Sequence, residues 1–389
     1  MTVKLGISRL LEQPSEFVDD QRIGLICNQA SVSPDFQHVA DLMFNSKALK
    51  LTALFGPQHG IRGDVQDNMV ETAHSVDPQT GLPVFSLYSE TREPSAAMLN
   101  EVDALVFDLQ DVGCRVYTFI YTMANAMRAC ANQGKRFIVC DRPNPIGGDL
   151  VEGALLEKGN ESFVGQFPIP MRHGLTVGEL AELFNREYGI GCDLSVVKME
   201  GWARASGYEA TGCSWVLPSP NIPTVDTAFV FPGTVYFEGT GISEGRGTTR
   251  PFEQVGAPYI DSEKLAAEMN RMNLEGVYFR PTVFLPTFQK HSGSPCGGVF
   301  LHVTDRRAFR PVLTGIAILS KILEMYSGKF AWKEPPYEYE YDRNPFDVIA
   351  GTTRLRQMIE SGISAVDIAE TWKEDESDFK RLRENYLLY

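Results

Sequence analysis

Short apolar runs that each stop at a polar loop restrict the fold of this chain more than any other feature. Five of them lie in the first 145 residues, at 22–27, 51–55, 83–87, 102–107 and 136–140. Runs that are apolar throughout predict strands buried on both faces, because a half-exposed strand alternates apolar and polar residues. A helical pattern over 116–133, ended by Gly134, is typical of the segments between them. The sequence therefore predicts a doubly wound α/β domain built on a parallel sheet.

The loops that follow these runs hold most of the side chains that could do chemistry. Ligands of such sheets bind at the carboxyl ends of the strands, so we expect these loops to converge on one site. The candidates that they supply are Asn28, Gln58, His59, Arg62, Asp64, Tyr88, Asp108, Asp111, Arg115, Tyr117 and Asn144.

The second half of the chain has a different pattern. Thr176 and Glu179 predict a capping box at the start of a helix over 177–188. A loop-rich region at 200–258 precedes a helix near 261–272, strands near 277–285 and 297–304, a helix at 307–327 and a helical pattern at 363–373. We therefore divide the chain into an α/β domain, 1–164, and a second α+β domain, 165–389, packed over the first, since 389 residues predict about two domains.

A glycine-rich segment in the second half supplies further candidates. Residues 233–253 read GTVYFEGTGISEGRGTTRPFE, and so many glycines indicate a backbone that turns sharply or closely approaches a ligand. This segment presents Glu238, Glu244 and Arg246, and the proline-rich segment 217–227 presents Asn221. The other candidates are Arg172, His173 and His291.

Charge and motif content exclude several classes of protein. A net charge of −14 without a Lys/Arg cluster argues against nucleic acid or an anionic membrane as partner. The seven cysteines form no CxxC pair, so we predict neither a metal site nor a disulfide framework. No glycine-rich phosphate-binding motif follows any strand, and GxSxG is absent, so we predict no nucleotide cofactor and no serine-hydrolase triad. The sequence shows no leader and no long apolar stretch, which favours a cytoplasmic protein.

Seven ordered motifs resemble those of one bacterial family. They include GPQHGIRGD at 56–64, VDALVFDLQDVGCRVYTFI at 102–120, DRPNPIGG at 141–148 and MRHGLTVGELAELFN at 171–185, with others at 80–95, 219–253 and 284–305. The chain resembles the exo-acting β-N-acetylmuramidases, glycoside hydrolases long described as a domain of unknown function, over roughly residues 5–389.

The resemblance implies an enzyme that removes terminal N-acetylmuramic acid from peptidoglycan fragments during cell-wall recycling. It also implies a Rossmann-like domain joined to a second domain, with the active site at their interface. Many members of the family have glutamate where this chain has Gln58, a departure that leaves the identity of the acid and the base open.

Glycoside cleavage uses two carboxyl groups that flank the scissile bond. Our first hypothesis is that Asp108 or Asp111 supplies one of these carboxyl groups and that Glu244, from the glycine-rich segment, supplies the other. Glu238 is either catalytic or a buried structural partner of Arg250 or Arg246, and Gln58 and His59 complete the catalytic candidates. Alternatively, Asp108, Asp111 and Arg115 form a structural ion pair beside helix N-terminal amides.

The lactyl carboxylate of N-acetylmuramic acid suits the fork of an arginine, for which Arg62, Arg172 and Arg246 are candidates. Tyr88 and Tyr117 could stack on the sugar. His173 and His291 are either site residues or buried structural histidines, and Asn144 either forms a turn or binds the sugar. Because of Gln58, a non-catalytic muropeptide-binding protein is the alternative function.

Overall fold

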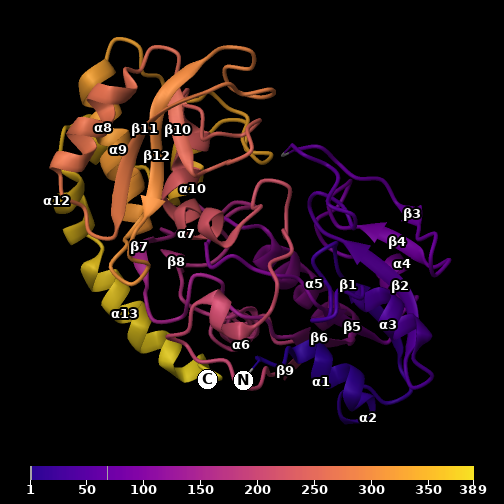
Figure 1. The fold of residues 1–389 in the computed structure, drawn as a ribbon. Coiled ribbons are helices and arrows are strands. Elements are labelled where there is room, and N and C mark those ends of the chain that lie inside the picture. Colours follow the sequence, from indigo (N-terminus) through magenta and orange to yellow (C-terminus); the bar gives the residue numbers. More distant parts are fainter. Residues whose placement is uncertain (1, 68) are drawn as a thin grey trace.

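A seven-stranded sheet organises the N-terminal half of the computed structural model, which describes residues 2–67 and 69–389 (Figure 1). The five predicted strands are confirmed as β1 (Arg22–Ile26), β2 (Lys50–Gly56), β4 (Pro83–Ser86), β5 (Ala104–Phe107) and β6 (Arg136–Cys140). The order is β3-β4-β2-β1-β5-β6-β9, parallel except for β3 (Ser75–Val76). The chain changes direction across the sheet between β1 and β5, so a topological switch point lies there.

Helices cover both faces of this sheet because its central strands are buried on both. Leu105 and Phe107 of β5 pack toward α5 (Phe119–Gln133) and α6 (Val177–Arg186), whereas Ala104 and Val106 pack toward α1 (Gly6–Glu12) and α3 (Val39–Asn45). The short helices α2 (Pro14–Phe17) and α4 (Ala96–Leu99) complete this half. Gly134 ends α5 in the left-handed conformation, and the predicted capping box at Thr176 is present.

The sheet draws on residues past 164, where we expected the second domain to begin. β9 (Asp193–Val197) pairs with β6 along five residues, and α6 packs on the same layer. A small antiparallel pair of strands, β7 (Glu152–Leu155) and β8 (Pro170–Arg172), lies between β6 and α6 in the chain. One hydrophobic cluster continues from the sheet through α5 into α7 and α9, so the two halves share a core.

The C-terminal half contains a three-stranded antiparallel sheet of order β10-β12-β11. Its strands are β10 (Gln254–Ala257), β11 (Val277–Phe284) and β12 (Cys296–Val303), flanked by α8 (Ser262–Arg271) and α9 (Pro311–Tyr326). All but β10, which lies in the region predicted as loop-rich, are close to the predicted bounds. The helix α7 (Val225–Thr234) lies in the region predicted as loop-rich, because Pro232 and Gly233 obscure its pattern. Gly233 is required where α9 crosses, since a Cβ there would lie 1.8 Å from the Pro311 carbonyl oxygen.

The last helices return the chain to its beginning. They are α10 (Pro345–Ala350), α11 (Arg354–Glu360), α12 (Ala365–Glu370) and α13 (Lys373–Arg383), with 3-10 turns at Tyr208–Thr211, Val235–Gly239 and Glu384–Tyr386. α13 runs along the side of the molecule, and the C-terminus lies beside the N-terminus (Figure 1). There the Tyr389 hydroxyl donates to Asp141 Oδ2 at 2.8 Å.

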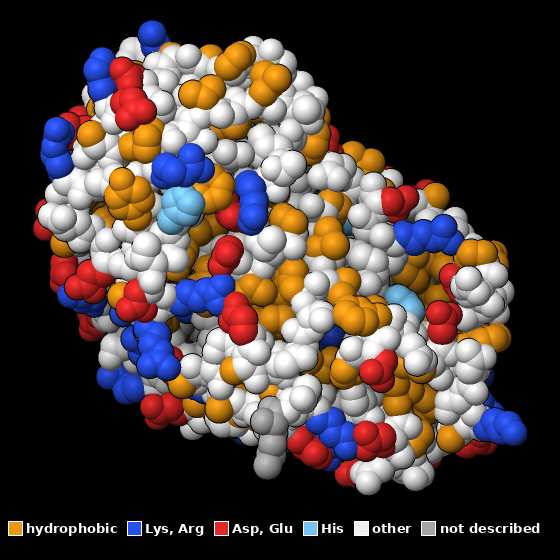
Figure 2. Space-filling view, viewed as in Figure 1, with side chains coloured by type: hydrophobic (Ala, Val, Ile, Leu, Met, Phe, Trp, Pro, Cys, Tyr) orange, Lys and Arg blue, Asp and Glu red, His pale blue; other side chains and the backbone are white. Residues whose placement is uncertain are grey.

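The surface shows no concentration of one charge on the face in Figure 2, where basic and acidic side chains are interspersed. In the part of the chain that the structure describes, no helix combines the length and the apolar character needed to cross a membrane.

Candidate active site

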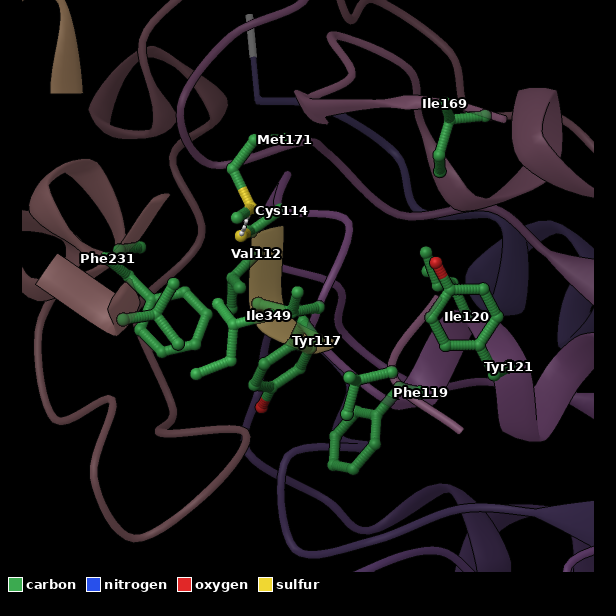
Figure 3. Packing of buried hydrophobic residues seen from close by; sticks show 14 of the residues in the cluster. Val112, Cys114, Tyr117, Phe119, Ile120, Tyr121, Ile169, Met171, Phe231 and Ile349 are labelled. Carbon is green, nitrogen blue, oxygen red and sulfur yellow. Dashed lines mark hydrogen bonds between the residues drawn. The ribbon is translucent and has the colours of Figure 1, made fainter. Parts of the chain in front are cut away.

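A pocket lies where both halves of the chain meet. Its polar lining includes Gln58 and His59 after β2, Thr118 before α5, and Glu238, Arg246 and Glu338 from the C-terminal half. Its apolar wall includes Tyr117 and Phe231. Figure 3 shows Tyr117 beside Phe119, with its hydroxyl directed away from the Cys114–Met171 contact.

Glu338 is the most unusual residue of this pocket. It is 3% exposed, and its backbone and that of Tyr339 adopt left-handed conformations with φ of 43° and 69°. Its Oε1 accepts a hydrogen bond from Gln58 Nε2 at 3.2 Å, and its Oε2 accepts one from the Tyr88 hydroxyl at 2.8 Å. Burial raises the pKa of Glu338, although these two donors oppose the shift. The carboxyl group therefore favours its protonated form more than an exposed glutamate does.

Gln58 holds Glu338 with an amide group whose oxygen and nitrogen both form hydrogen bonds. Thr118 Oγ1 donates to Gln58 Oε1 at 2.6 Å, and Gln58 Nε2 donates to the Tyr88 hydroxyl at 3.0 Å as well as to Glu338. The Arg92 guanidinium lies 4.3 Å from the Tyr88 ring centroid and 4.2 Å from that of Tyr339. Position 58 thus supplies a donor to a carboxyl group from the other half of the chain.

Glu238 has the opposite electrostatic environment. Its Oε1 accepts from Arg246 Nε at 3.1 Å, and its Oε2 accepts from the Tyr337 hydroxyl at 2.7 Å. Burial opposes its ionisation, but Arg246 and Tyr337 outweigh burial and lower the pKa of Glu238. The pocket therefore holds two glutamates whose pKa values move in opposite directions, the arrangement expected of an acid and a partner carboxylate.

Glu244 lies behind Arg246 and does not line the pocket. It pairs with Lys290 Nζ at 2.6 Å and with Arg246 Nε at 3.4 Å. Lys290 is fixed in turn by the carbonyl oxygens of Phe237 and Ile242, both at 2.8 Å. Arg246 Nη1 has no hydrogen-bond partner among the described residues, although its guanidinium packs over Phe252.

His59 and Asn221 line the same pocket. His59 adopts φ of 71°, and its Nδ1 lies 2.7 Å from the Val65 carbonyl oxygen, so Nδ1 carries the proton. Burial lowers the pKa of His59 to about 4, which keeps the ring neutral and its Nε2 an acceptor at neutral pH. Asn221 is held by Gln66 through both ends of its amide.

The structure places Asp108 of our first hypothesis outside this pocket. Both of its carboxylate oxygens accept from Arg142, at 2.7 Å each, and the pair is buried. Asp111 accepts from the Gly113 amide and lies 3.3 Å from His173 Nε2, also away from the pocket lining. For Asp108 the structural alternative, an ion pair, fits better, although its partner is Arg142 and not Arg115.

Several other candidates have structural partners. Arg115 donates to the carbonyls of Ala154, Ile169, Ile349 and Ala350. Asn28, Asn144 and His291 bind the carbonyls of Pro218, Leu175 and Gly241, respectively. Arg62 and Asp64 are exposed, and Arg172 lines a separate cavity. None of these side chains lines the pocket.

Glu338 and Tyr337 were not predicted from the sequence. The only signal is the alternation Tyr337-Glu338-Tyr339-Glu340 after two prolines in a tail that is otherwise helical. This alternation alone does not show which of the two glutamates faces a pocket.

Comparison with known proteins supports the resemblance noted above. Models of the N- and C-terminal parts of exo-beta-N-acetylmuramidase NamZ match residues 23–226 and 229–389, respectively. The chain belongs to the NamZ family. The junction of the two matches lies at α7.

Relatives of the NamZ family match along the whole chain. The peptidoglycan beta-N-acetylmuramidase NamZ of Bacillus subtilis (strain 168) is 46% identical over 388 residues, covering 100% of this chain and 91% of that protein. Crystal structures of two DUF1343 family proteins from Bacteroides fragilis NCTC 9343 cover 100% of this chain and 99% of theirs. Their TM-scores are 0.90 and 0.79, at 38% and 30% identity.

Proposed function

We propose that this protein is an exo-acting β-N-acetylmuramidase that releases terminal N-acetylmuramic acid from peptidoglycan fragments. Membership of the NamZ family and the name of the Bacillus subtilis relative support the reaction. The observation that carries the proposal for this chain is the pair Glu338 and Glu238, which line one pocket with oppositely shifted pKa values.

In the proposed mechanism Glu338 is the general acid. Its raised pKa lets it keep a proton that it gives to the glycosidic oxygen as the bond to the anomeric carbon breaks. Glu238 stays ionised and stabilises the positive charge that develops on the sugar ring, because Arg246 and Tyr337 hold it as a carboxylate. Water then adds to the anomeric carbon, and the proton that it releases restores the acid form of Glu338. His59 Nε2 accepts a hydrogen bond from the substrate.

Arg246 is the proposed ligand of the lactyl carboxylate. Of the three arginines suggested by the sequence, it alone lines the pocket, and its Nη1 has no partner among the described residues. Glu244 and Lys290 act as positioning residues, since Glu244 holds Arg246 from behind.

The architecture fits this proposal. The parallel strands in chain order β1, β2, β4, β5, β6 and β9 take the spatial order 3-2-1-4-5-6, which supports the proposal of a Rossmann-like domain. We propose that this part and the C-terminal part together form the active site at their interface. We further propose a cytoplasmic role in cell-wall recycling, on small fragments.

The test is hydrolysis of a disaccharide with non-reducing N-acetylmuramic acid, compared with one that has N-acetylglucosamine in that position. We expect release of free N-acetylmuramic acid from the first, and loss of at least about a hundredfold in turnover for Glu238→Gln. Measurable binding of the first disaccharide without turnover would contradict the proposal and favour a non-catalytic muropeptide-binding protein.

A further inference from the structure

A second cavity, lined by arginines, lies apart from the candidate active site. The loops around 146–150 and 204–207, Phe229 of α7, and Arg306 with Arg307 form its walls, and it shares no lining residue with the first pocket. Its volume is about 370 Å³, which is within the range of small-molecule sites. The proposed hydrolase mechanism uses none of its side chains.

The charge that lines this cavity is predominantly positive. Four arginines, at 172, 204, 306 and 307, face a single acid, Asp149. Glu179 pairs with Arg204, and Glu209 and Asp226 pair with Arg306, so these two cations are balanced. Arg172 and Arg307 form no ion pair within residues 2–67 and 69–389, and only the longer-range charges of Glu152 and Asp149 offset that of Arg172.

Arg172 is the strongest indication of a ligand. It is 2% exposed, and its Nη2 donates to the Ile146 carbonyl, but its Nε and Nη1 have no partner among the described residues. Burial lowers the pKa of Arg172 to about 10, so the group is still charged at neutral pH. Glu152 lies opposite in the β7–β8 pair, yet its Oε2 also has no partner, and burial raises its pKa to about 7. A buried cation with two unused donors is poorly compensated.

We propose that this cavity binds an oxyanion, a phosphate or a carboxylate, carried by a small molecule. Arg307, which is exposed, attracts such a group at the mouth, and the positive charge of the buried Arg172 in the wall stabilises it inside. Because the cavity exceeds the size of a single ion, the anion belongs to a larger molecule.

The experiment measures saturable binding of inorganic phosphate and of D-lactate to the full chain, by calorimetry at low chloride, and D-lactate is also measured with Arg246→Met, which removes the proposed lactyl ligand of the active site. We expect one of the two to bind, which distinguishes a phosphate from a carboxylate ligand. Arg307→Glu should raise its dissociation constant at least about tenfold, and Arg172→Met should abolish binding. Arg280→Glu is the matched control, because Arg280 is also exposed but does not line the cavity.

The site is refuted if neither anion saturates, or if Arg307→Glu binds as the wild type does. Arg307→Glu keeps the test valid should Arg172→Met fail to fold. Hydrolysis of the disaccharide by Arg307→Glu should equal that of the wild type, so this proposal and the proposed function can fail independently.

Discussion

Replacing Glu338 by glutamine separates its proposed role as general acid from a structural one. The change preserves shape but removes the proton that the leaving group needs, which predicts a loss of about 10²–10⁴ in turnover, or about 2.7–5.5 kcal/mol in the barrier. The new amide also faces two donors, Gln58 Nε2 and the Tyr88 hydroxyl. Relative to the ionised carboxylate, one buried hydrogen bond is therefore lost, at about 1–3 kcal/mol of unfolding free energy.

The assay compares the natural disaccharide with a p-nitrophenyl muraminide, whose leaving group departs without protonation. Glu338→Gln should retain activity within about tenfold on the nitrophenyl substrate and lose it on the disaccharide. The wild type should lose activity as the pH rises through the raised pKa of Glu338, and the variant should lack this alkaline limb.

Glu340→Gln is the matched control, because Glu340 lies in the same loop but pairs with Arg343 outside the pocket. Equal losses on both substrates would refute the assignment of Glu338 as the acid. Urea unfolding of each variant checks that both variants are folded under the conditions of the assay.

Four further predictions follow from contacts described above. Arg142→Met leaves the buried Asp108 unpaired and should lower the free energy of unfolding by about 3–5 kcal/mol. Lys50→Met, which breaks the exposed ion pair with Asp20, should lower it by less than about 1 kcal/mol, and equal effects of the two changes in urea unfolding would refute the importance of the buried pair. Tyr389→Phe removes the donor to Asp141 and should cost about 1–3 kcal/mol, whereas Tyr341→Phe, at 66% exposure, should cost nothing measurable in the same assay. Gly315→Ala places a Cβ 2.1 Å from the Gly233 carbonyl oxygen and should lower the free energy of unfolding by about 1–3 kcal/mol. Gly328→Ala is the control, because a Cβ there meets nothing within 4 Å. A larger loss of thermal stability for Gly328→Ala than for Gly315→Ala would contradict the contact between α7 and α9. A substrate without the lactyl group should bind the wild type as weakly as the intact substrate binds Arg246→Met. If calorimetry shows that the substrate without the lactyl group binds the wild type as tightly as the intact one, Arg246 does not bind the lactyl carboxylate.

The sequence predicts the buried strands well, because a strand covered on both faces must be apolar throughout. β9 was missed for the same reason, since its sequence DLSVV lies at the sheet edge with only Val197 buried. α7 was missed because a proline and a glycine close to its end serve the contact with α9 and not the helix itself.

The site was predicted in part. The glycine-rich segment offered Arg250 or Arg246 as a buried partner of Glu238, and the structure pairs Glu238 with Arg246, eight residues later. The strand-end rule located Asp108 but could not show that Arg142, 34 residues later, occupies both of its oxygens. The position of Glu338 in the pocket depends on a left-handed backbone and on contact with Gln58, 280 residues earlier. Neither feature can be predicted from the local sequence pattern.

The bond between Tyr389 and Asp141 joins positions 248 residues apart. At synthesis rates of about 5–20 residues per second, Asp141 leaves the ribosome roughly 12–50 seconds before the phenol that binds it. Until that residue is present, Asp141 lacks one of its hydrogen-bond donors. A chain cut before Tyr389 would leave the buried Asp141 without this donor, so the stability of the N-terminal sheet depends in part on a residue that follows α13.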